Sequence, residues 1–334
     1  MDYETETEIE DSEKDAREPK KDSQLSTSIL IAAIILAGTW IYTTSPKSTG
    51  DSLQSNSTQN TGVSSLEEAV MPSDGVVLPV SWGNLGSKLV DTGTIDSDKL
   101  KAIYSQRGFT EEYESLLSGQ NEGKLKITRE NSGYLLNLFW ALGLANKNEI
   151  LERGEMTNPA YGGPGNFAST GGWTLAVGNS MDHYSMHTLF TLTGEQQVMV
   201  DRVSRGIYRP CCGNSTHFPD CNHGMAMLGL LELMVSQGVS EQEMWETALT
   251  VNSYWFPDTY LTIATYMKDK GIDWKDINTE EILGKDFSSS QGFANISAQV
   301  IQPESSQQQK GGGGCSVGGG APVPQQQKQV GCGV

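Results

Sequence analysis

The residues best suited to chemistry gather in one short stretch, residues 211–223, which we call the cysteine loop. It holds three of the chain's five cysteines and two of its four histidines: Cys211, Cys212, His217, Cys221 and His223. The other two histidines, His183 and His187, lie a little upstream. Thiolate and imidazole are the ligands that zinc, copper and other soft or borderline metals prefer. We therefore predict a transition-metal site, for zinc or copper, built from these seven side chains.

Two other uses of the same cysteines remain open. Cys221 precedes an apolar helix, whose dipole would stabilise its thiolate, so with Cys211 or Cys212 it could form a redox-active dithiol. In an oxidising compartment the same pair could instead be a disulfide that only closes the loop. The spacing does not decide between them, because Cys-Cys-x8-Cys-x-His is not a familiar zinc-finger pattern and no haem-attachment motif is present.

These side chains must be positioned by a domain that we place at residues 71–301, with a pattern of mostly helical segments. The cysteine loop runs into residues 225–235, which are apolar almost all round and should form a central helix. His183 and His187 would project from one face of a helix over 181–192, because they are four residues apart. Further helices are expected at 82–90, 97–104, 111–117, 134–144, 194–207, after Ser240 and at 258–268, with a short β pair near 124–128.

The glycine-rich stretch 158–180 interrupts this rhythm and predicts a long loop, of the kind that is usually functional or mobile. It could contact a partner, which would suit a structural or interaction domain, the third function we consider. Residues 163–168 match a dinucleotide-binding fingerprint in letters, but no strand–helix–strand unit surrounds them. The fold class we predict is therefore all-α, a single multi-helix globular domain, without a nucleotide cofactor.

Both ends of the chain differ from the middle. Residues 1–24 are strongly acidic and residues 302–334 are rich in glycine and glutamine, so both should be disordered. Residues 25–44 carry no charge and are long and apolar enough to cross a bilayer. An acidic start does not suit a cleaved signal peptide, so an uncleaved anchor is predicted. Residues 45–70 would form a flexible linker.

Basic residues set the expected orientation of this anchor. Arg17, Lys20 and Lys21 precede it, whereas Lys47 alone follows it. The prediction is a single-pass membrane protein with a cytoplasmic N-terminus and an extracytoplasmic main domain. Two cysteines in the C-terminal stretch, Cys315 and Cys332, could then deliver metal to the domain or exchange thiols with it.

The charge balance narrows the choice of partners. The chain has 41 acidic and 23 basic residues, a net charge of -18. Binding to nucleic acid needs clustered Lys and Arg, so we exclude it. No hydrolase, kinase or phosphate-loop motif is present. The predicted function is therefore metal binding, and possible metal handling or transfer, by a membrane-anchored domain, with no enzyme class assigned.

Overall fold

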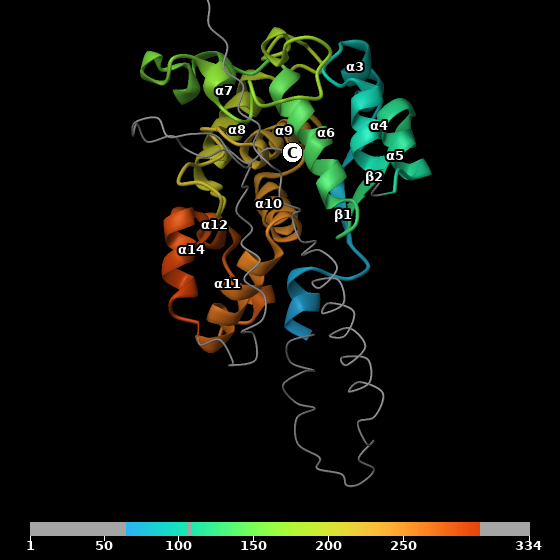
Figure 1. The fold of residues 1–334 in the computed structure, drawn as a ribbon. Coiled ribbons are helices and arrows are strands. Elements are labelled where there is room, and N and C mark those ends of the chain that lie inside the picture. The colour runs from blue at the N-terminus through green and yellow to red at the C-terminus, as the bar shows by residue number, and fades with distance from the viewer. Residues whose placement is uncertain (1–64, 106–107, 301–334) are drawn as a thin grey trace, which may run out of the picture. The chain divides into compact units, whose positions relative to one another are not determined.

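The computed structural model describes residues 65–105 and 108–300 (Figure 1). The predicted acidic tail at 1–24, the anchor at 25–44 and the tail at 302–334 lie outside the described residues, as does most of the 45–70 segment. Residues 65–70 form a short helix, and Val70 at its end is buried. Within the described ranges, no helix is both long enough and apolar enough to cross a membrane.

Two antiparallel helices form the centre of the domain. Helix α6 (Ser132–Ala145) and helix α9 (Asn222–Ser236) are buried along nearly their whole length, as their apolar sequences predicted. They approach closely because glycines face each other across the contact. A Cβ atom on Gly143 would lie 2.2 Å from the carbonyl oxygen of Met225, and one on Gly229 would lie 2.4 Å from that of Phe139. Only a residue without a side chain allows this backbone contact.

Adding a methyl group at this contact should therefore separate the two central helices. We expect Gly143→Ala to lower the free energy of unfolding by about 1–3 kcal/mol, the usual cost of overpacking a core. Gly133→Ala is the matched control on the same helix, because a Cβ atom there meets nothing within 4 Å. It should be neutral or stabilising by up to about 1 kcal/mol. Urea denaturation of both variants checks this, and equal stabilities would contradict it.

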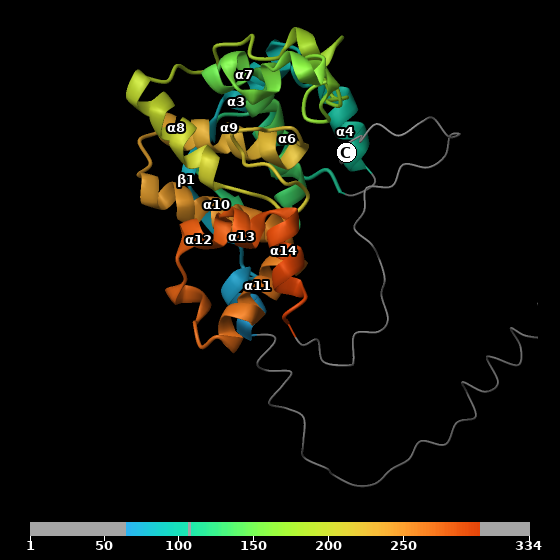
Figure 2. The ribbon, with the colours of Figure 1, turned by 90° about the vertical axis from the view of Figure 1, so that its left-hand side faces the viewer.

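Some of the remaining helices pack directly on this pair, whereas those of the C-terminal part gather on the other side of the helix over residues 241–255 (Figure 2). Helix α8 (Gly194–Gly206) and helix α10 (Glu241–Trp255) both begin with a capping box, the second at Ser240 as expected. Helix α11 (Pro257–Asp269) begins with a proline in its first turn. The shorter helices are α3 (Leu85–Asp91), α4 (Ser97–Ser105), α5 (Glu111–Ser118), α7 (Glu149–Arg153), α12 (Thr279–Leu283), α13 (Lys285–Ser288) and α14 (Ser290–Ser297). Single 3-10 turns are η1 (Glu155–Thr157), η2 (Pro159–Tyr161), η3 (Pro164–Asn166), η4 (Ser180–Asp182) and η5 (Trp274–Asp276).

The domain is mostly helical, but it also contains a small sheet, so the all-α prediction needs correction. Strand β1 (Val76–Gly83) pairs antiparallel with β2 (Asn121–Ile127). The second strand lies where a β pair was considered. The first strand includes Trp82, which we had placed at the start of a helix over 82–90. Residues Leu78, Val80 and Trp82 are buried alternately, and this period of two is that of a strand.

The predicted helix over 181–192 was wrong. After the single turn η4 the chain makes a further turn over residues 184–186, and His187 then forms an isolated bridge with Asn146. The backbone amides of Ser185 and His187 donate to the carbonyls of Leu144 and Ala145 instead of to a helix of their own. Ser185 has a φ of 54°, a left-handed conformation that breaks a helix. Residues 158–180 form irregular structure with short turns, as expected.

One acidic side chain is buried inside this helical core. Glu232 of α9 is 0% exposed, and its oxygens accept hydrogen bonds from Nδ2 of Asn146 at 2.7 Å and of Asn148 at 2.5 Å. Asn146 follows α6 and Asn148 precedes α7, so Glu232 joins three helices. Burial raises the pKa of Glu232 to about 8, although the two amide donors act in the opposite direction.

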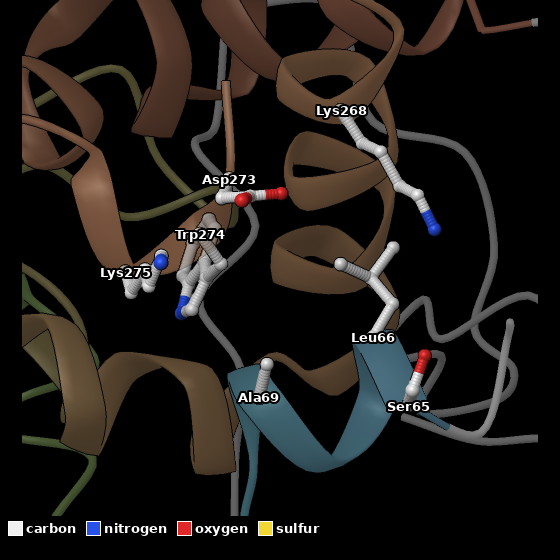
Figure 3. A pocket seen from close by; sticks show the side chains of 7 residues that line it. All are labelled: Ser65, Leu66, Ala69, Lys268, Asp273, Trp274 and Lys275. Carbon is white, nitrogen blue, oxygen red and sulfur yellow. The ribbon is translucent and has the colours of Figure 1, made fainter. Parts of the chain in front are cut away.

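A cavity of about 220 Å³ lies beside the 65–70 helix (Figure 3). Figure 3 shows Leu66 and Ala69 on one side and Trp274 with Asp273 on the other. No cysteine or histidine lines it. The cysteines and histidines singled out in the sequence therefore lie elsewhere in the domain.

Candidate metal centre

The cysteine loop connects α8 to α9 and is organised around a buried arginine. Arg209 is 1% exposed. Its Nε donates to Cys221 Sγ at 3.0 Å, and its Nη2 to Asp220 Oδ1 at 2.6 Å. The same guanidinium donates to the backbone carbonyls of Asn214 and Phe218 at 3.0 and 3.2 Å. One side chain therefore fixes both the middle and the end of the loop.

Cys221 lies at the junction of the loop and the central helix. It is the N-cap residue of α9, and its sulfur accepts a hydrogen bond from the backbone N–H of Gly224 at 3.4 Å. Burial opposes ionisation of the thiol, but hydrogen bonds from Cys211 and Cys212, the charge of Arg209 and a contact with His223 outweigh it. The pKa of Cys221 is therefore held well below its usual range, which favours the thiolate form.

The other two cysteines, Cys211 and Cys212, lie close to the sulfur of Cys221. The Sγ atom of Cys211 is 3.3 Å from that of Cys212 and 3.6 Å from that of Cys221. A disulfide would require about 2.05 Å, and all three cysteines of the described region are free thiols. Hydrogen bonding to Cys212 and Cys221, together with burial, raises the pKa of Cys211. The pKa values of Cys211 and Cys221 are therefore shifted in opposite directions by the contacts within the cluster.

His223 completes the cluster from the first turn of α9. Its ring packs on Phe256 and Trp255, with centroid separations of 4.4 and 5.8 Å. Its Nδ1 atom is buried and has no hydrogen-bond partner among the described residues. A buried polar atom without a partner is uncommon and calls for an explanation. A metal ion bound through this histidine would supply one.

Cys211, Cys221 and His223 form a group that could hold a metal ion, since their ligand atoms all lie within 4.8 Å of one another. Zinc–sulfur bonds of about 2.3 Å in a tetrahedron place two sulfurs roughly 3.8 Å apart. The observed 3.6 Å between Cys211 and Cys221 is close to that separation. The spacing and the donor types of this group therefore fit a transition-metal ion.

Cys212, Asp220 and Cys221 form a second group with the same spacing. Asp220 is less available as a ligand, because Arg209 and Asn214 already donate to its two oxygens. Burial raises the pKa of Asp220, and the charge of Arg209 opposes this. We therefore regard the group containing His223 as the stronger one, with Cys212 beside it as an additional thiol.

His183 and His187 do not belong to either group. Their rings form a separate pair in which Nδ1 of His183 lies 3.0 Å from Nε2 of His187, and Nε2 of His183 lies 3.1 Å from the carbonyl oxygen of Val177. Burial and the neighbouring His183 ring lower the pKa of His187. The two histidines do meet, as predicted, but they do so across a turn over residues 184–186 rather than on a helix face.

His217 also leaves the cluster, although it lies within the cysteine loop. Its Nε2 atom is 2.9 Å from Oδ1 of Asp201 on α8, which draws the imidazole away from the cysteines. The seven predicted ligands therefore divide among three places. Arg209, the residue that organises the loop, was not predicted, because nothing near it in the sequence distinguishes a buried arginine from an exposed one.

Comparisons with known proteins found no relative of this chain. No protein-family profile matches the chain, and no curated protein or solved structure matches it. The function of the domain is therefore inferred from the geometry of its cysteine–histidine cluster.

Proposed function

We propose that the domain binds a thiophilic transition-metal ion, zinc or monovalent copper, through Cys211, Cys221 and His223. The observation that carries this proposal is the convergence of their three ligand atoms within 4.8 Å. The lowered pKa of Cys221 favours the thiolate form that binds metal. A ring nitrogen of His223 offers the third ligand, and the buried Nδ1 of this ring has no hydrogen-bond partner among the described residues.

The arrangement favours handling of the ion over permanent storage. Structural zinc sites are closed by four protein ligands, whereas three ligands leave one position open. Cys211 is exposed, and Cys212 lies beside it with a sulfur that can enter the open position or replace a ligand. A site with an exposed thiol and a spare thiol can pass its ion to another thiol protein. The cysteines at 315 and 332 are the donors or acceptors that we propose within the chain.

The cellular location that we propose for the domain rests on the sequence of the N-terminal segment. The apolar stretch 25–44 would anchor the chain in a membrane, with the domain outside the cytoplasm. Metal transfer at a membrane surface is consistent with an exposed thiol ligand and an acidic, soluble domain. Reporter fusions that place the C-terminus in the cytoplasm would remove this part of the proposal.

A dithiol function is the second candidate, favoured by the 3.6 Å separation between a thiolate and a neutral thiol. It is the weaker candidate because Cys221 is only 3% exposed, whereas reactive cysteines are usually partly accessible. A count of free thiols before and after reduction separates the two. If the loop binds metal, all five cysteines of the chain should count as free thiols after the metal is removed, whereas a resting disulfide in the loop would leave three at most.

The metal site is tested by zinc titration of the reduced full-length chain. We expect tight binding of one ion, and Cys221→Ser should weaken it by more than about 100-fold, beyond the 10–100-fold typical of second-shell losses. Serine is a good N-cap residue, so α9 should still begin correctly. His223→Gln should also weaken binding, whereas His187→Gln, the control, should leave it unchanged. Undiminished binding by Cys221→Ser would contradict the proposal.

A further inference from the structure

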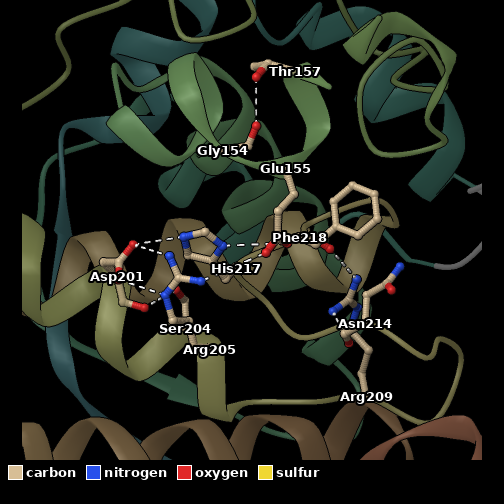
Figure 4. Close-up of polar contacts among 10 residues, drawn as sticks. All are labelled: Gly154, Glu155, Thr157, Asp201, Ser204, Arg205, Arg209, Asn214, His217 and Phe218. Carbon is tan, nitrogen blue, oxygen red and sulfur yellow. Dashed lines mark hydrogen bonds and ion pairs between the residues drawn. The ribbon is translucent and has the colours of Figure 1, made fainter. Parts of the chain in front are cut away.

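His217 lies at a second cluster of charged groups, which the thiol site does not use. A cavity of about 320 Å³ opens there between α7 and α8. Its lining includes Glu149, Arg153, Gln197, Asp201, Arg205 and His217. Figure 4 shows the imidazole of His217 between Asp201 of α8 and Glu155, which follows α7.

The contacts of Asp201 determine which nitrogen of His217 is available. A carboxylate only accepts hydrogen bonds, so Nε2 of His217 carries the proton that Asp201 Oδ1 accepts at 2.9 Å. Arg205 holds the same carboxylate through two contacts of 2.9 and 3.0 Å. In the neutral imidazole, Nδ1 therefore carries the lone pair. His217 is 5% exposed, and its Nδ1 has no hydrogen-bond partner within the described part of the chain.

Glu155 faces this unpartnered nitrogen at a distance that suits a shared ion. Its Oε2 atom lies 3.7 Å from Nδ1 of His217. This is longer than a hydrogen bond. Two metal–ligand bonds of about 2.1 Å, at angles between tetrahedral and trigonal, span roughly 3.4–3.6 Å. A histidine that binds metal through one nitrogen and donates to a carboxylate through the other is the common arrangement at such sites.

The surrounding charges also favour a cation. Three carboxylates, from Glu149, Glu155 and Asp201, face two guanidinium groups in and beside the cavity. The charge of Arg205 is largely neutralised by Asp201, and its contact with Glu155 is 3.9 Å long. One imidazole nitrogen and one carboxylate oxygen are ligands for a borderline divalent ion. The cysteine cluster, which is rich in sulfur, instead favours a softer metal.

We propose that this cavity is a second metal site, which binds a divalent cation of the zinc or cobalt type through His217 Nδ1 and Glu155. Water in the cavity completes the coordination. Asp201 is a positioning residue, since it touches the imidazole and not the ion. The site is independent of the thiol cluster and has different donor chemistry.

The test uses the full-length chain carrying Cys211→Ser and Cys221→Ser, so that the thiol site is absent. Cobalt titration followed by calorimetry and absorption should show one bound Co²⁺ per chain without a thiolate-to-cobalt charge-transfer band. His217→Gln or Glu155→Gln should abolish binding. Asp201→Asn should weaken it by about 10–100-fold, as expected for a second-shell partner. His187→Gln is the control and should bind as before.

Glu155→Gln keeps the test valid if the histidine variant fails to fold, because the Glu155 side chain is 52% exposed and its loss should leave the fold intact. Thermal unfolding without metal verifies this. The proposal is overturned if the serine double variant binds no cobalt, or if its binding survives both His217→Gln and Glu155→Gln. Neither result bears on the thiol site, which the double variant lacks.

Discussion

Replacing Arg209 with alanine should abolish metal binding at the cysteine loop and lower the free energy of unfolding by about 3–5 kcal/mol. Arg209 is buried and forms an ion pair with Asp220, which is 9% exposed. Removing one partner of a buried pair leaves the other charge uncompensated, and this costs about that amount. The carbonyls of Asn214 and Phe218 would lose their donor as well. Urea denaturation and zinc titration measure the two effects.

Two further variants separate the causes of this loss. Arg209→Lys keeps the positive charge but cannot reproduce the planar set of contacts, so we expect an intermediate loss of stability and metal affinity. Arg202→Ala is the control, because Arg202 pairs with Glu241 at the surface with its side chain 55% exposed. Such pairs contribute about 1 kcal/mol or less. The assignment of Arg209 fails if its alanine variant binds zinc normally and unfolds like the control.

Stability should fall as pH rises from about 4.5 to 8, because of Glu232. The native state keeps this carboxyl protonated up to its pKa of about 8, whereas in the unfolded chain it ionises near 4.3. Between these values the native state binds more protons, so each pH unit costs up to about 1.4 kcal/mol. The total is on the order of 5 kcal/mol, and well above pH 8 this contribution no longer changes.

Comparing the wild type with Glu232→Gln isolates this group from the other titrating residues. Unfolding free energies measured at pH 5.5 and 8.5 should differ more in the wild type than in the variant, by up to about 3–4 kcal/mol. Glu195→Gln on the exposed surface of α8 should retain the wild-type dependence. Parallel stability curves for wild type and Glu232→Gln would show that the buried carboxyl does not titrate as stated.

The two central helices were predictable because their own sequences, without any tertiary contact, indicate both a helix and its burial. Residues 134–144 and 225–235 are apolar on nearly every face, so only a buried helix suits them. Ser240 and Glu243 form a local capping box, which needs no tertiary contact to be recognised. Strand β1 was missed because its alternating residues Leu78, Val80 and Trp82 run into a helical pattern, and the boundary was placed too early.

The candidate site was predictable in composition but not in arrangement. The clustering of cysteines indicated the loop, and the apolar helix that follows Cys221 indicated a residue near a helix N-terminus, but the capping contact to Gly224 was not predicted. The partners of the histidines depend on tertiary structure. The four-residue spacing of His183 and His187 implies a shared face only in a helix, and the left-handed backbone of Ser185 prevents one. Asp201, which draws His217 away, belongs to a different element.

The sulfur atom of Cys221 takes part in two different interactions. It receives the N–H of Gly224 at the first turn of α9, and the same sulfur belongs to the group that could hold an ion. An ion bound at this atom would weaken the hydrogen bond that the sulfur accepts from Gly224. Deuterium exchange of the Gly224 amide would then differ between the metal-loaded and the metal-free protein. The occupancy of the cluster would in this way affect the first turn of a helix in the centre of the core.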